Sequence, residues 1–393
     1  MRVLAFGTYD VRSHPRVQVL IDGLRSRGHE VAEANARLGL STAERVRILR
    51  EPWRVPVLVG RIIACWASLV LRSRRFRGPA GPDAVLIGYL GHFDVLLARA
   101  LFPRTTLVLD HLIFAANTAA DRGAAGGLRE RALSLLDHLA LTAADVIVVD
   151  TDEHSAMVPE QLRERAVVVP VGATDDWFAA SGTAAAMSDG GEAGHLPSFG
   201  SGEPYVAGAG GTVPLSVVFF GLFTPLQGST VIGRALRLLH ERGAPVHTTL
   251  IGSGQDAAAV HADVDELPSV TWVDWVDADQ LPAVVAAHDV CLGIFGTTDK
   301  ALRVVPNKVY QGAAAGAAIV TSATEPQRRV LGDAAVLTPP GDAEALADAL
   351  AELAGRPERV RQLRLAATSR ASSDFTAAAV TGPLHRVLVD GRR

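Results

Sequence analysis

Short apolar runs alternate with longer segments of helical periodicity along most of the chain. This alternation is typical of a parallel β-sheet whose two faces are covered by helices. In the first half it predicts strands at 2–7, 29–34, 84–89, 105–110, 145–150 and 166–171, with helices at 16–27, 128–143 and 153–164. Several of these strands end at Gly or Asp, where doubly wound sheets present their binding loops.

The alternation stops at residues 181–213, where Gly, Ser and Ala dominate and no period survives, as in a linker. It then resumes, predicting strands at 216–221, 248–254, 270–276, 290–295, 317–322 and 335–339, a helix at 228–242 and a helical segment at 343–388. We therefore expect an α/β protein with two Rossmann-like parallel-sheet domains facing each other across a cleft. The expected parts are an N-terminal domain at 1–180, a linker at 181–213, a C-terminal domain at 214–375, and a helix at 376–393 able to pack back on the first domain.

Composition agrees with this division. A chain of 393 residues exceeds what one hydrophobic core usually serves, and 48% apolar with 20% charged residues describes a soluble globular protein. The net charge of −4 leaves no basic excess for nucleic acid. Cys65 and Cys291 form no CxxC pair, which favours a reducing compartment. The N-terminus reads as a buried strand and not as a signal peptide, so we expect a cytoplasmic location.

A glycine-rich turn closes the predicted strand segment at 248–254. Gly252, Gly254 and Ala257 satisfy the GxGxxA pattern of dinucleotide-binding turns, and Asp274 lies near the spacing of a ribose-binding acid. However, that pattern usually opens its domain, and here a complete strand–turn–helix unit precedes it. A tight turn at the floor of the cleft is therefore preferred to nicotinamide binding.

Two pairs of acids have the spacing of divalent-cation ligands. Asp150 with Asp152, and Asp263 with Asp265, could hold a cation against a diphosphate. Asp152 also stands where a helix N-cap belongs, and Asp263 and Asp265 have the pattern of a solvated helix face, so capping and solvation are preferred. The twelve histidines show no HExxH or other metal-binding spacing. We therefore expect no metal ion.

Two further places at predicted strand ends carry polar groups. His111 follows Asp110 at the end of a central strand, where either a functional or a packing role is open. His14 stands with Arg12 and Arg16 in the loop after the first strand, which would line the cleft or be solvated.

The segment 54–77 carries six arginines and no acid around an apolar centre that contains Trp66. The uninterrupted apolar stretch is too short for a membrane-spanning helix, because Arg61 interrupts it. A basic amphipathic segment can lie on anionic lipid, and the alternative is a helix packed on the first sheet with a solvated basic end.

The most basic loop of the second half precedes the helix that begins at Pro306 and Asn307. Lys300, Arg303 and Lys308 surround this helix start. Because the first turn of a helix has free N–H groups and a favourable dipole for anions, a diphosphate could bind here. Solvated cations beside a helix are the alternative.

Several segments together resemble one known family. They are 13–31, 135–155, 169–178, 217–236, 250–256 and "VVPNKVYQGAAAGAAIVTS" at 304–322. In order and spacing they are similar to the retaining GT-B glycosyltransferases of glycosyltransferase family 4. The resemblance covers most of 1–180 and 214–390. It implies that the second domain binds a nucleotide-sugar donor and the first domain binds the acceptor.

By this resemblance, the donor-binding residues are Gly221, Thr224, Gln227, Gly252, Gly254, Asn307, Lys308 and Gln311. The sequence departs from the family at two places. Gln311 and Arg303 stand where relatives commonly carry a pair of Glu. The loop of Thr224 and Gln227 has no cation, whereas many relatives carry an Arg and a Lys there. We therefore expect Lys300, Arg303 and Lys308 to supply the charge that holds the diphosphate. Gln311 is expected to bond the ribose hydroxyls.

In the first domain, the resemblance places His111 at the donor sugar. The loop bearing Gly7, Arg12, His14 and Arg16 would lie on the acceptor side. His111, Lys300 and Arg303 form the expected catalytic set. The implied reaction transfers a hexose-type sugar from a nucleotide-diphosphate donor to an acceptor hydroxyl, with retention and without a metal or other cofactor.

The acceptor class stays open: a sugar, a lipid-linked saccharide or a natural product. The basic segment 54–77 suggests contact with the inner face of a membrane. Three other functions also stay open. They are a GT-B-type nucleotide-sugar epimerase or inactive relative, a two-lobed small-molecule binding protein, and a nicotinamide oxidoreductase.

Overall fold

The computed structural model describes residues 1–11, 14–39, 53, 55–76, 78, 81–88, 91–112, 114, 127–189 and 213–391. The chain forms two compact units. The first unit is Met1–Pro170 with Ala377–Arg393, and the second is Val171–Thr376. Arg12 lies outside the described residues.

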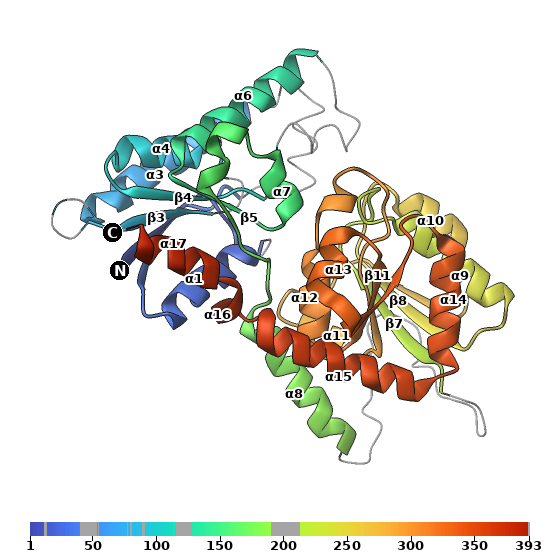
Figure 1. The fold of residues 1–393 in the computed structure, drawn as a ribbon. Coiled ribbons are helices and arrows are strands. Elements are labelled where there is room, and N and C mark those ends of the chain that lie inside the picture. The colour runs from blue at the N-terminus through green and yellow to red at the C-terminus, as the bar shows by residue number, and fades with distance from the viewer. Residues whose placement is uncertain are drawn as a thin grey trace. The chain divides into compact units, whose positions relative to one another are not determined.

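The first unit is built on a six-stranded parallel sheet in the order β2-β1-β3-β4-β5-β6 (Figure 1). Its strands are β1 (Arg2–Gly7), β2 (Glu30–Asn35), β3 (Ala84–Ile87), β4 (Thr106–Asp110), β5 (Val146–Val149) and β6 (Ala166–Val168). Its helices are α1 (Arg16–Ser26), α3 (Val55–Ser73), α4 (Asp94–Leu101), α6 (Gly127–Ala143), α7 (Asp152–Met157), α16 (Ala377–Val380) and α17 (Gly382–Asp390).

Both faces of this sheet are covered by helices, which is why its central strands β1, β3, β4 and β5 are mostly apolar without alternation. Leu4 and Phe6 of β1 point to the face covered by α3, α4 and α6. Val3 and Ala5 point to the opposite face, which α1 and α17 cover. The C-terminal helix α17 is therefore part of the core of the first unit.

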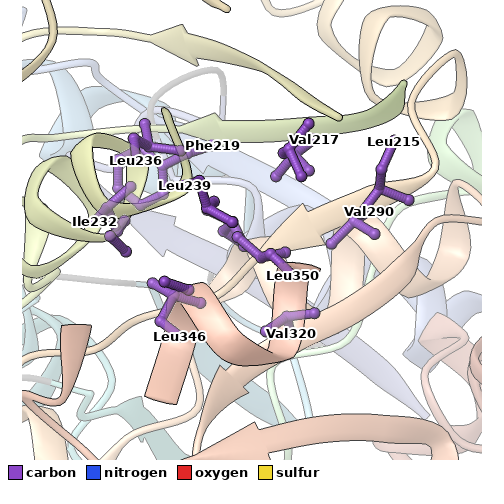
Figure 2. Packing of buried hydrophobic residues seen from close by; sticks show 14 of the residues in the cluster. Leu215, Val217, Phe219, Ile232, Leu236, Leu239, Val290, Val320, Leu346 and Leu350 are labelled. Carbon is purple, nitrogen blue, oxygen red and sulfur yellow. The ribbon is translucent and has the colours of Figure 1, made fainter. Parts of the chain in front are cut away.

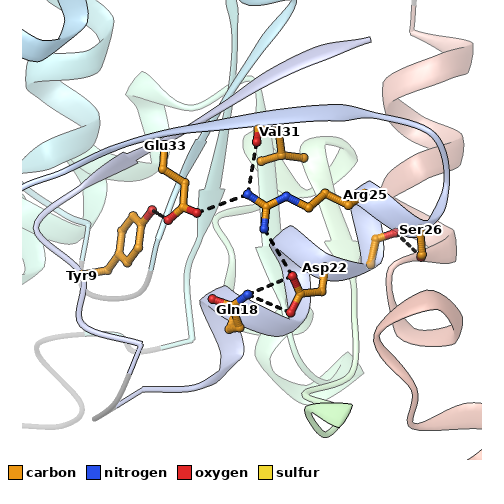
Figure 3. A network of polar contacts seen from close by, with 8 residues as sticks. Tyr9, Gln18, Asp22, Arg25, Ser26, Val31 and Glu33 are labelled. Carbon is orange, nitrogen blue, oxygen red and sulfur yellow. Dashed lines mark hydrogen bonds and ion pairs between the residues drawn. The ribbon is translucent and has the colours of Figure 1, made fainter.

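A polar network joins α1 to the edge strand β2 (Figure 3). Glu33 accepts hydrogen bonds from the Tyr9 hydroxyl at 3.0 Å and from the Arg25 guanidinium at 3.3 Å. Arg25 also donates to Asp22 at 3.4 Å, and Gln18 donates to Asp22 at 2.8 Å. Burial and the neighbouring Glu33 carboxylate raise the pKa of Tyr9, so the phenol stays protonated and holds this bond.

The second unit has a six-stranded parallel sheet in the order β12-β11-β10-β7-β8-β9. Its strands are β7 (Leu215–Phe220), β8 (Val246–Ile251), β9 (Val270–Val273), β10 (Val290–Leu292), β11 (Ala318–Ser322) and β12 (Ala335–Thr338). Its helices are α8 (Asp175–Asp189), α9 (Ser229–Glu241), α10 (Ala257–Val264), α11 (Leu281–Ala286), α12 (Asn307–Ala314), α13 (Glu325–Leu331), α14 (Ala343–Ala354) and α15 (Pro357–Asp374).

One face of this second sheet forms the core shown in Figure 2. Phe219 of β7 packs there in one cluster with Leu236 and Leu239 of α9 and with Leu346 and Leu350 of α14. The alternate residues of β7 face a second cluster that contains residues of α8, α11, α12 and α15. Burial of both faces matches the continuous apolar strands that the sequence predicts.

Every predicted strand has an observed counterpart, and the predicted α/β class with two parallel sheets is confirmed. The differences lie in the helices and the predicted linker. The predicted helix at 153–164 ends at Met157, and a 3₁₀ helix, Glu160–Arg165, follows Pro159. The segment 343–388 divides into α14, α15, α16 and α17. Of the predicted linker at 181–213, residues up to Asp189 continue α8, and 190–212 lie outside the described residues.

Candidate functional site

The strand order of the second unit reverses between β7 and β10. In an open parallel sheet, ligands bind outside the carboxyl ends of the strands at such a reversal. The loops that follow these two strands are bonded to each other, because the Phe295 N–H donates to the Gln227 carbonyl at 3.0 Å. A side chain at Gly228 would meet the Gly296 nitrogen at 2.4 Å, so the two loops touch backbone to backbone.

The turns that follow β7 and β8 contain glycines and lie against each other. Gly221 and Gly252 have φ of 125° and 122°, a conformation that residues with a side chain rarely adopt. A Cβ at Gly252 would lie 2.1 Å from the Gly221 carbonyl oxygen, and one at Gly254 would lie 2.3 Å from the Phe223 carbonyl oxygen. Close approach of two turns therefore accounts for both glycines of the GxGxxA pattern.

Lys308, in the first turn of α12, brings a buried cation to this place. The side chain is 5% exposed, and its ammonium donates to the Gln227 amide oxygen at 2.6 Å. The same nitrogen lies 3.7 Å from the centre of the Phe219 ring, and 3.5 Å from where a Cβ on Gly221 would be. Burial lowers the pKa of Lys308 to about 7. Among the described residues, no carboxylate forms an ion pair with it.

The structure thus brings together Gly221, Gln227, Gly252 and Lys308 from the predicted donor-binding set. Gln311 lies one turn further along α12 and is 9% exposed. Arg303 ends a 3₁₀ helix that Lys300 precedes, and it lies 3.3 Å from the Asp299 carboxylate. The Thr224 carbonyl accepts a hydrogen bond from the Gln227 N–H at 2.9 Å. Asn307 is the first residue of α12 after the cap Pro306.

Phe219 is a residue of this site that the sequence analysis missed. Its ring lies beneath the Lys308 ammonium, where the face of an aromatic ring stabilises a cation. An aromatic residue near the end of a buried strand is also typical of a hydrophobic core, so the sequence alone did not distinguish a binding-site role from a packing role.

The first unit has its own reversal of strand order, between β1 and β3. Asp94 anchors the loop there: it accepts bonds from the Thr8 N–H at 2.7 Å, the Thr8 hydroxyl at 2.8 Å and the Trp66 indole at 3.1 Å. A Cβ at Gly7 would lie 2.9 Å from this carboxylate, which explains the glycine. Burial raises the pKa of Asp94, and the bonds from Thr8 and Trp66 oppose that rise.

Arg16, predicted on the acceptor side, is buried inside the first unit. Its guanidinium donates to Asp110 at 2.8 Å and to the carbonyls of Val169 and Pro170 at 2.9 Å each. These contacts tie α1 to the carboxyl ends of β4 and β6, which is a structural role. The backbone N–H of His14 donates to the Asp10 carbonyl at 2.9 Å.

His111 follows β4 and is 1% exposed. Burial lowers its pKa to about 3, so the imidazole is neutral. Neither ring nitrogen has a hydrogen-bond partner. Direct contact with a donor sugar would require this side chain to become accessible, and that role stays a prediction.

The acids predicted to cap or to face solvent are placed as follows. The N-cap of α7 is Thr151, whose hydroxyl accepts from the His154 N–H at 3.1 Å, so Asp152 is a first-turn residue and not the cap. Asp150 instead lies 2.5 Å from His154 Nδ1. The Asp263 and Asp265 carboxylates lie 3.5 Å from Arg237 and 2.5 Å from His261.

Helix α3 exposes an apolar face. The stretch Pro56–Phe76 is long and apolar enough to cross a bilayer, and 11% of its most apolar part is buried. Ile63 and Leu71 are 61% and 60% exposed, while Leu69 packs into the core of the first unit.

Comparison with solved structures defines the class of this fold. Sucrose-phosphate synthase from Thermosynechococcus elongatus matches with a TM-score of 0.69 at 14% identity, over 100% of each chain. HepE of Anabaena, in complex with UDP and glucose, matches with a TM-score of 0.65 at 13% identity, over 99% of this chain and 100% of that one. UDP-GlcNAc 2-epimerase from Neisseria meningitidis matches with a TM-score of 0.56 at 10% identity, over 99% and 100%. The fold is the GT-B fold of glycosyltransferases.

Residues 214–356 match the family model of glycosyl transferases group 1, and no curated protein sequence matches the chain. The second unit therefore carries a glycosyl transferases group 1 domain, in the part of the chain where Gly221, Gln227, Gly252 and Lys308 meet. This confirms the predicted enzyme class, a glycosyltransferase.

Proposed function

We propose that this protein transfers a hexose-type sugar from a nucleotide-diphosphate donor to an acceptor hydroxyl, with retention, in the manner of glycosyltransferase family 4. The observation that carries the proposal is the environment of Lys308. Its ammonium is buried against Phe219 and bonded to the neutral Gln227 amide. A buried charge without an opposite charge is costly, so this site favours an anionic ligand.

The diphosphate of the donor supplies that anion. Lys308 stands in the first turn of α12, where the helix N–H groups and dipole also favour negative charge. As the bond to the sugar breaks, negative charge grows on the departing diphosphate. Fixed cations and N–H groups stabilise such charge without reorganisation, and this electrostatic effect is usually the largest in catalysis. Lys308 would supply this positive charge without a metal ion.

The other predicted donor contacts follow from this placement. Gly221 lets a ligand approach the backbone beside Lys308 because it carries no Cβ, and Gly252 allows the two turns to contact each other there. Gln311, on the same helix as Lys308, is proposed to bond the ribose hydroxyls. Lys300 and Arg303 are proposed to assist at the diphosphate, although Arg303 already has Asp299 beside it.

Uridine nucleotides are the first donors to test, because HepE has been solved with UDP, UDP and glucose, and UDP-glucose. The acceptor remains a sugar, a lipid-linked saccharide or a natural product.

We also infer that α3 rests on the inner, cytoplasmic face of an anionic membrane. Ile63, Ala67 and Leu71 are spaced four apart and exposed on one side of the helix. Arg61, Arg72, Arg74 and Arg75 are exposed as well, and residues 52–82 contain no acid. Apolar side chains flanked by arginines are the pattern of a helix that lies in a membrane interface. Because Leu69 on the other side is buried in the core of the first unit, α3 is held in the plane of the membrane and does not span it.

A thermal-shift screen tests the donor proposal. A ligand at about 100 times its Kd stabilises the folded state by about 2.7 kcal/mol. We expect UDP, or another of GDP, ADP and TDP, to raise the melting temperature, and inorganic phosphate to raise it less. Incubation with the matching nucleotide sugar should then yield a glycoside. An epimerised nucleotide sugar without glycoside would favour the epimerase, and stabilisation by none of the four nucleotides would refute the proposal.

A further inference from the structure

Three buried polar side chains of the first unit meet beyond the carboxyl ends of β3 and β4. His92 lies in the turn between β3 and α4, His111 directly follows β4, and Asp137 lies on α6. All three are buried. Their metal-ligating atoms all lie within 4.8 Å of one another.

The group is only partly satisfied by hydrogen bonds. His92 Nε2 lies 3.0 Å from Asp137 Oδ1. The His111 ring stands against the His92 ring with centroids 5.0 Å apart, and both nitrogens of His111 lack a partner. A buried polar group without a hydrogen-bond partner is destabilising, and binding an ion is one way to satisfy it.

We propose that His92, His111 and Asp137 bind a divalent transition-metal ion of the zinc class. Two imidazoles and one carboxylate are ligands that Zn²⁺ favours, and three protein ligands leave a fourth position for water. With bonds of about 2.0–2.2 Å, the ligand atoms of a tetrahedral site stand roughly 3.3–3.6 Å apart. The observed limit of 4.8 Å needs side-chain movements of roughly 1 Å to reach that geometry.

The surroundings favour the imidazoles as ligands. His111 is 1% exposed and directly follows β4, so both of its unpartnered ring nitrogens lie inside the first unit. Its backbone N–H donates to the Val148 carbonyl at 2.8 Å, which fixes the start of the loop. His154, a further neighbour of His111, has its Nδ1 at 2.5 Å from Asp150 and is already engaged.

A metal here would join α6 to the β3–α4 turn and to the end of β4. It would stabilise the first unit, since binding to the folded state alone raises the free energy of unfolding. It shares no residue with the Lys308 site of the second unit, so the two proposals fail independently.

Metal analysis of the purified full chain tests this proposal. After dialysis against chelator and addition of Zn²⁺, we expect about one equivalent bound by elemental analysis and a raised melting temperature, with Mg²⁺ giving neither. His111→Ala and Asp137→Asn should each weaken Zn²⁺ binding about 100-fold or more. Loss of a residue that only hydrogen-bonds to a metal ligand typically weakens binding by about 10- to 100-fold. His261→Ala is the matched control, because His261 also pairs with an aspartate, Asp265, but on the surface of the other unit.

A second measurement needs no variant. X-ray absorption of the zinc-loaded chain should show two imidazole ligands and oxygen. Substoichiometric binding with an unchanged melting temperature, or an absorption spectrum without imidazole, would overturn the proposal. Equal Zn²⁺ affinity in His111→Ala and the unaltered chain would overturn it as well.

Discussion

The ammonium of Lys308 donates a hydrogen bond of 2.6 Å to the amide oxygen of Gln227, joining the first turn of α12 to the loop after β7. The acceptor is neutral, so the bond orients the ammonium without cancelling its charge. The Phe219 ring below adds a cation–π contact. The cation is thereby held in place at the reversal of strand order while its charge stays available to a ligand.

Replacing Lys308 by Met should weaken nucleotide binding without lowering the stability of the protein. A hydrogen bond to a charged group contributes about 1.5–3 kcal/mol, so Lys308→Met should weaken UDP binding by about 10- to 150-fold. Removal of a poorly compensated buried charge should leave the melting temperature of the nucleotide-free protein unchanged or higher. Isothermal titration and thermal melting measure the two effects. Lys300→Met is the control, and a larger loss of affinity in that variant would move the main diphosphate contact to Lys300.

Nucleotide binding should take up a proton at alkaline pH. Because the pKa of Lys308 is lowered to about 7, the free protein carries a largely neutral amine above that pH. A bound diphosphate stabilises the ammonium, so UDP affinity should fall as pH rises above about 7, approaching tenfold per pH unit. Titration at about pH 8 in two buffers of different ionisation enthalpy should show nearly one proton taken up, and much less at about pH 6. Lys308→Met should abolish the difference.

The lowered pKa of Lys308 also determines in which direction the free energy of unfolding changes with pH. The unfolded chain has a lysine pKa of about 10.4, so between about 7 and 10.4 it binds more protons than the folded chain. Through this group alone, the free energy of unfolding of the nucleotide-free protein therefore rises with pH in that window. The slope should be smaller in Lys308→Met, and an equal slope would show that other groups cause it.

The fold was predictable because most strands are marked by a short run of apolar residues that are consecutive in the sequence. Both faces of each sheet are covered, so most strands appear as nearly continuous apolar runs, although β2 (EVAEAN) and β8 (VHTTLI) also carry polar residues. Strand ends were less certain: the predicted strand at 290–295 stops at Leu292, and the Phe295 N–H donates to the loop after β7. The N-cap of α7 was misplaced by one residue, since Thr151 and Asp152 are both good caps and only the backbone conformation decides.

The sites were predictable only in part. Gly221, Gly252 and Lys308 stand in segments with recognisable spacing. The group of His92, His111 and Asp137 has no such spacing, because the three residues come from separate elements and meet only when the sheet and α6 are assembled. The burial of Arg16 was not predictable for the same reason: its partners Asp110 and Val169 are distant in sequence.

Gly252→Ala should destabilise the second unit strongly. The new Cβ would lie 2.1 Å from the Gly221 carbonyl oxygen, at a φ of 122°. Strain and overlap with rigid backbone together should cost at least about 3 kcal/mol in the free energy of unfolding. Gly243→Ala is the matched control, since Gly243 has a φ of 63° and open space around its Cβ position, and should cost about 1–2 kcal/mol. Equal losses in denaturant titrations would show that the contact between the two turns is not tight.

Arg16→Met should destabilise the first unit by about 3–5 kcal/mol, because it leaves the buried Asp110 carboxylate without its cation. If this is the cause, the double variant Arg16→Met with Asp110→Asn should recover part of the loss. Denaturant titration of the three proteins measures this coupling. No recovery in the double variant would mean that the lost bonds to the Val169 and Pro170 carbonyls dominate.

Membrane binding through α3 should depend on both its apolar side and its arginines. Vesicles of phosphatidylglycerol should bind the protein in a sedimentation assay, and phosphatidylcholine vesicles should bind it much less. Each basic residue near an anionic surface contributes about 1 kcal/mol, so changing Arg72, Arg74 and Arg75 to Gln should weaken binding about 100-fold. The matched control changes Arg356, Arg359 and Arg361 to Gln, which removes the same charge from another exposed surface.

Ile63→Glu with Leu71→Glu should abolish vesicle binding without lowering the melting temperature, since both side chains are exposed. Alkaline carbonate should release the unaltered protein from membranes, because a helix lying in the interface is held by charge and a shallow apolar face. Retention after carbonate would indicate a spanning helix. Equal weakening by the α15 control would indicate a nonspecific effect of net charge, and α3 would then be an apolar surface without a preference for lipid.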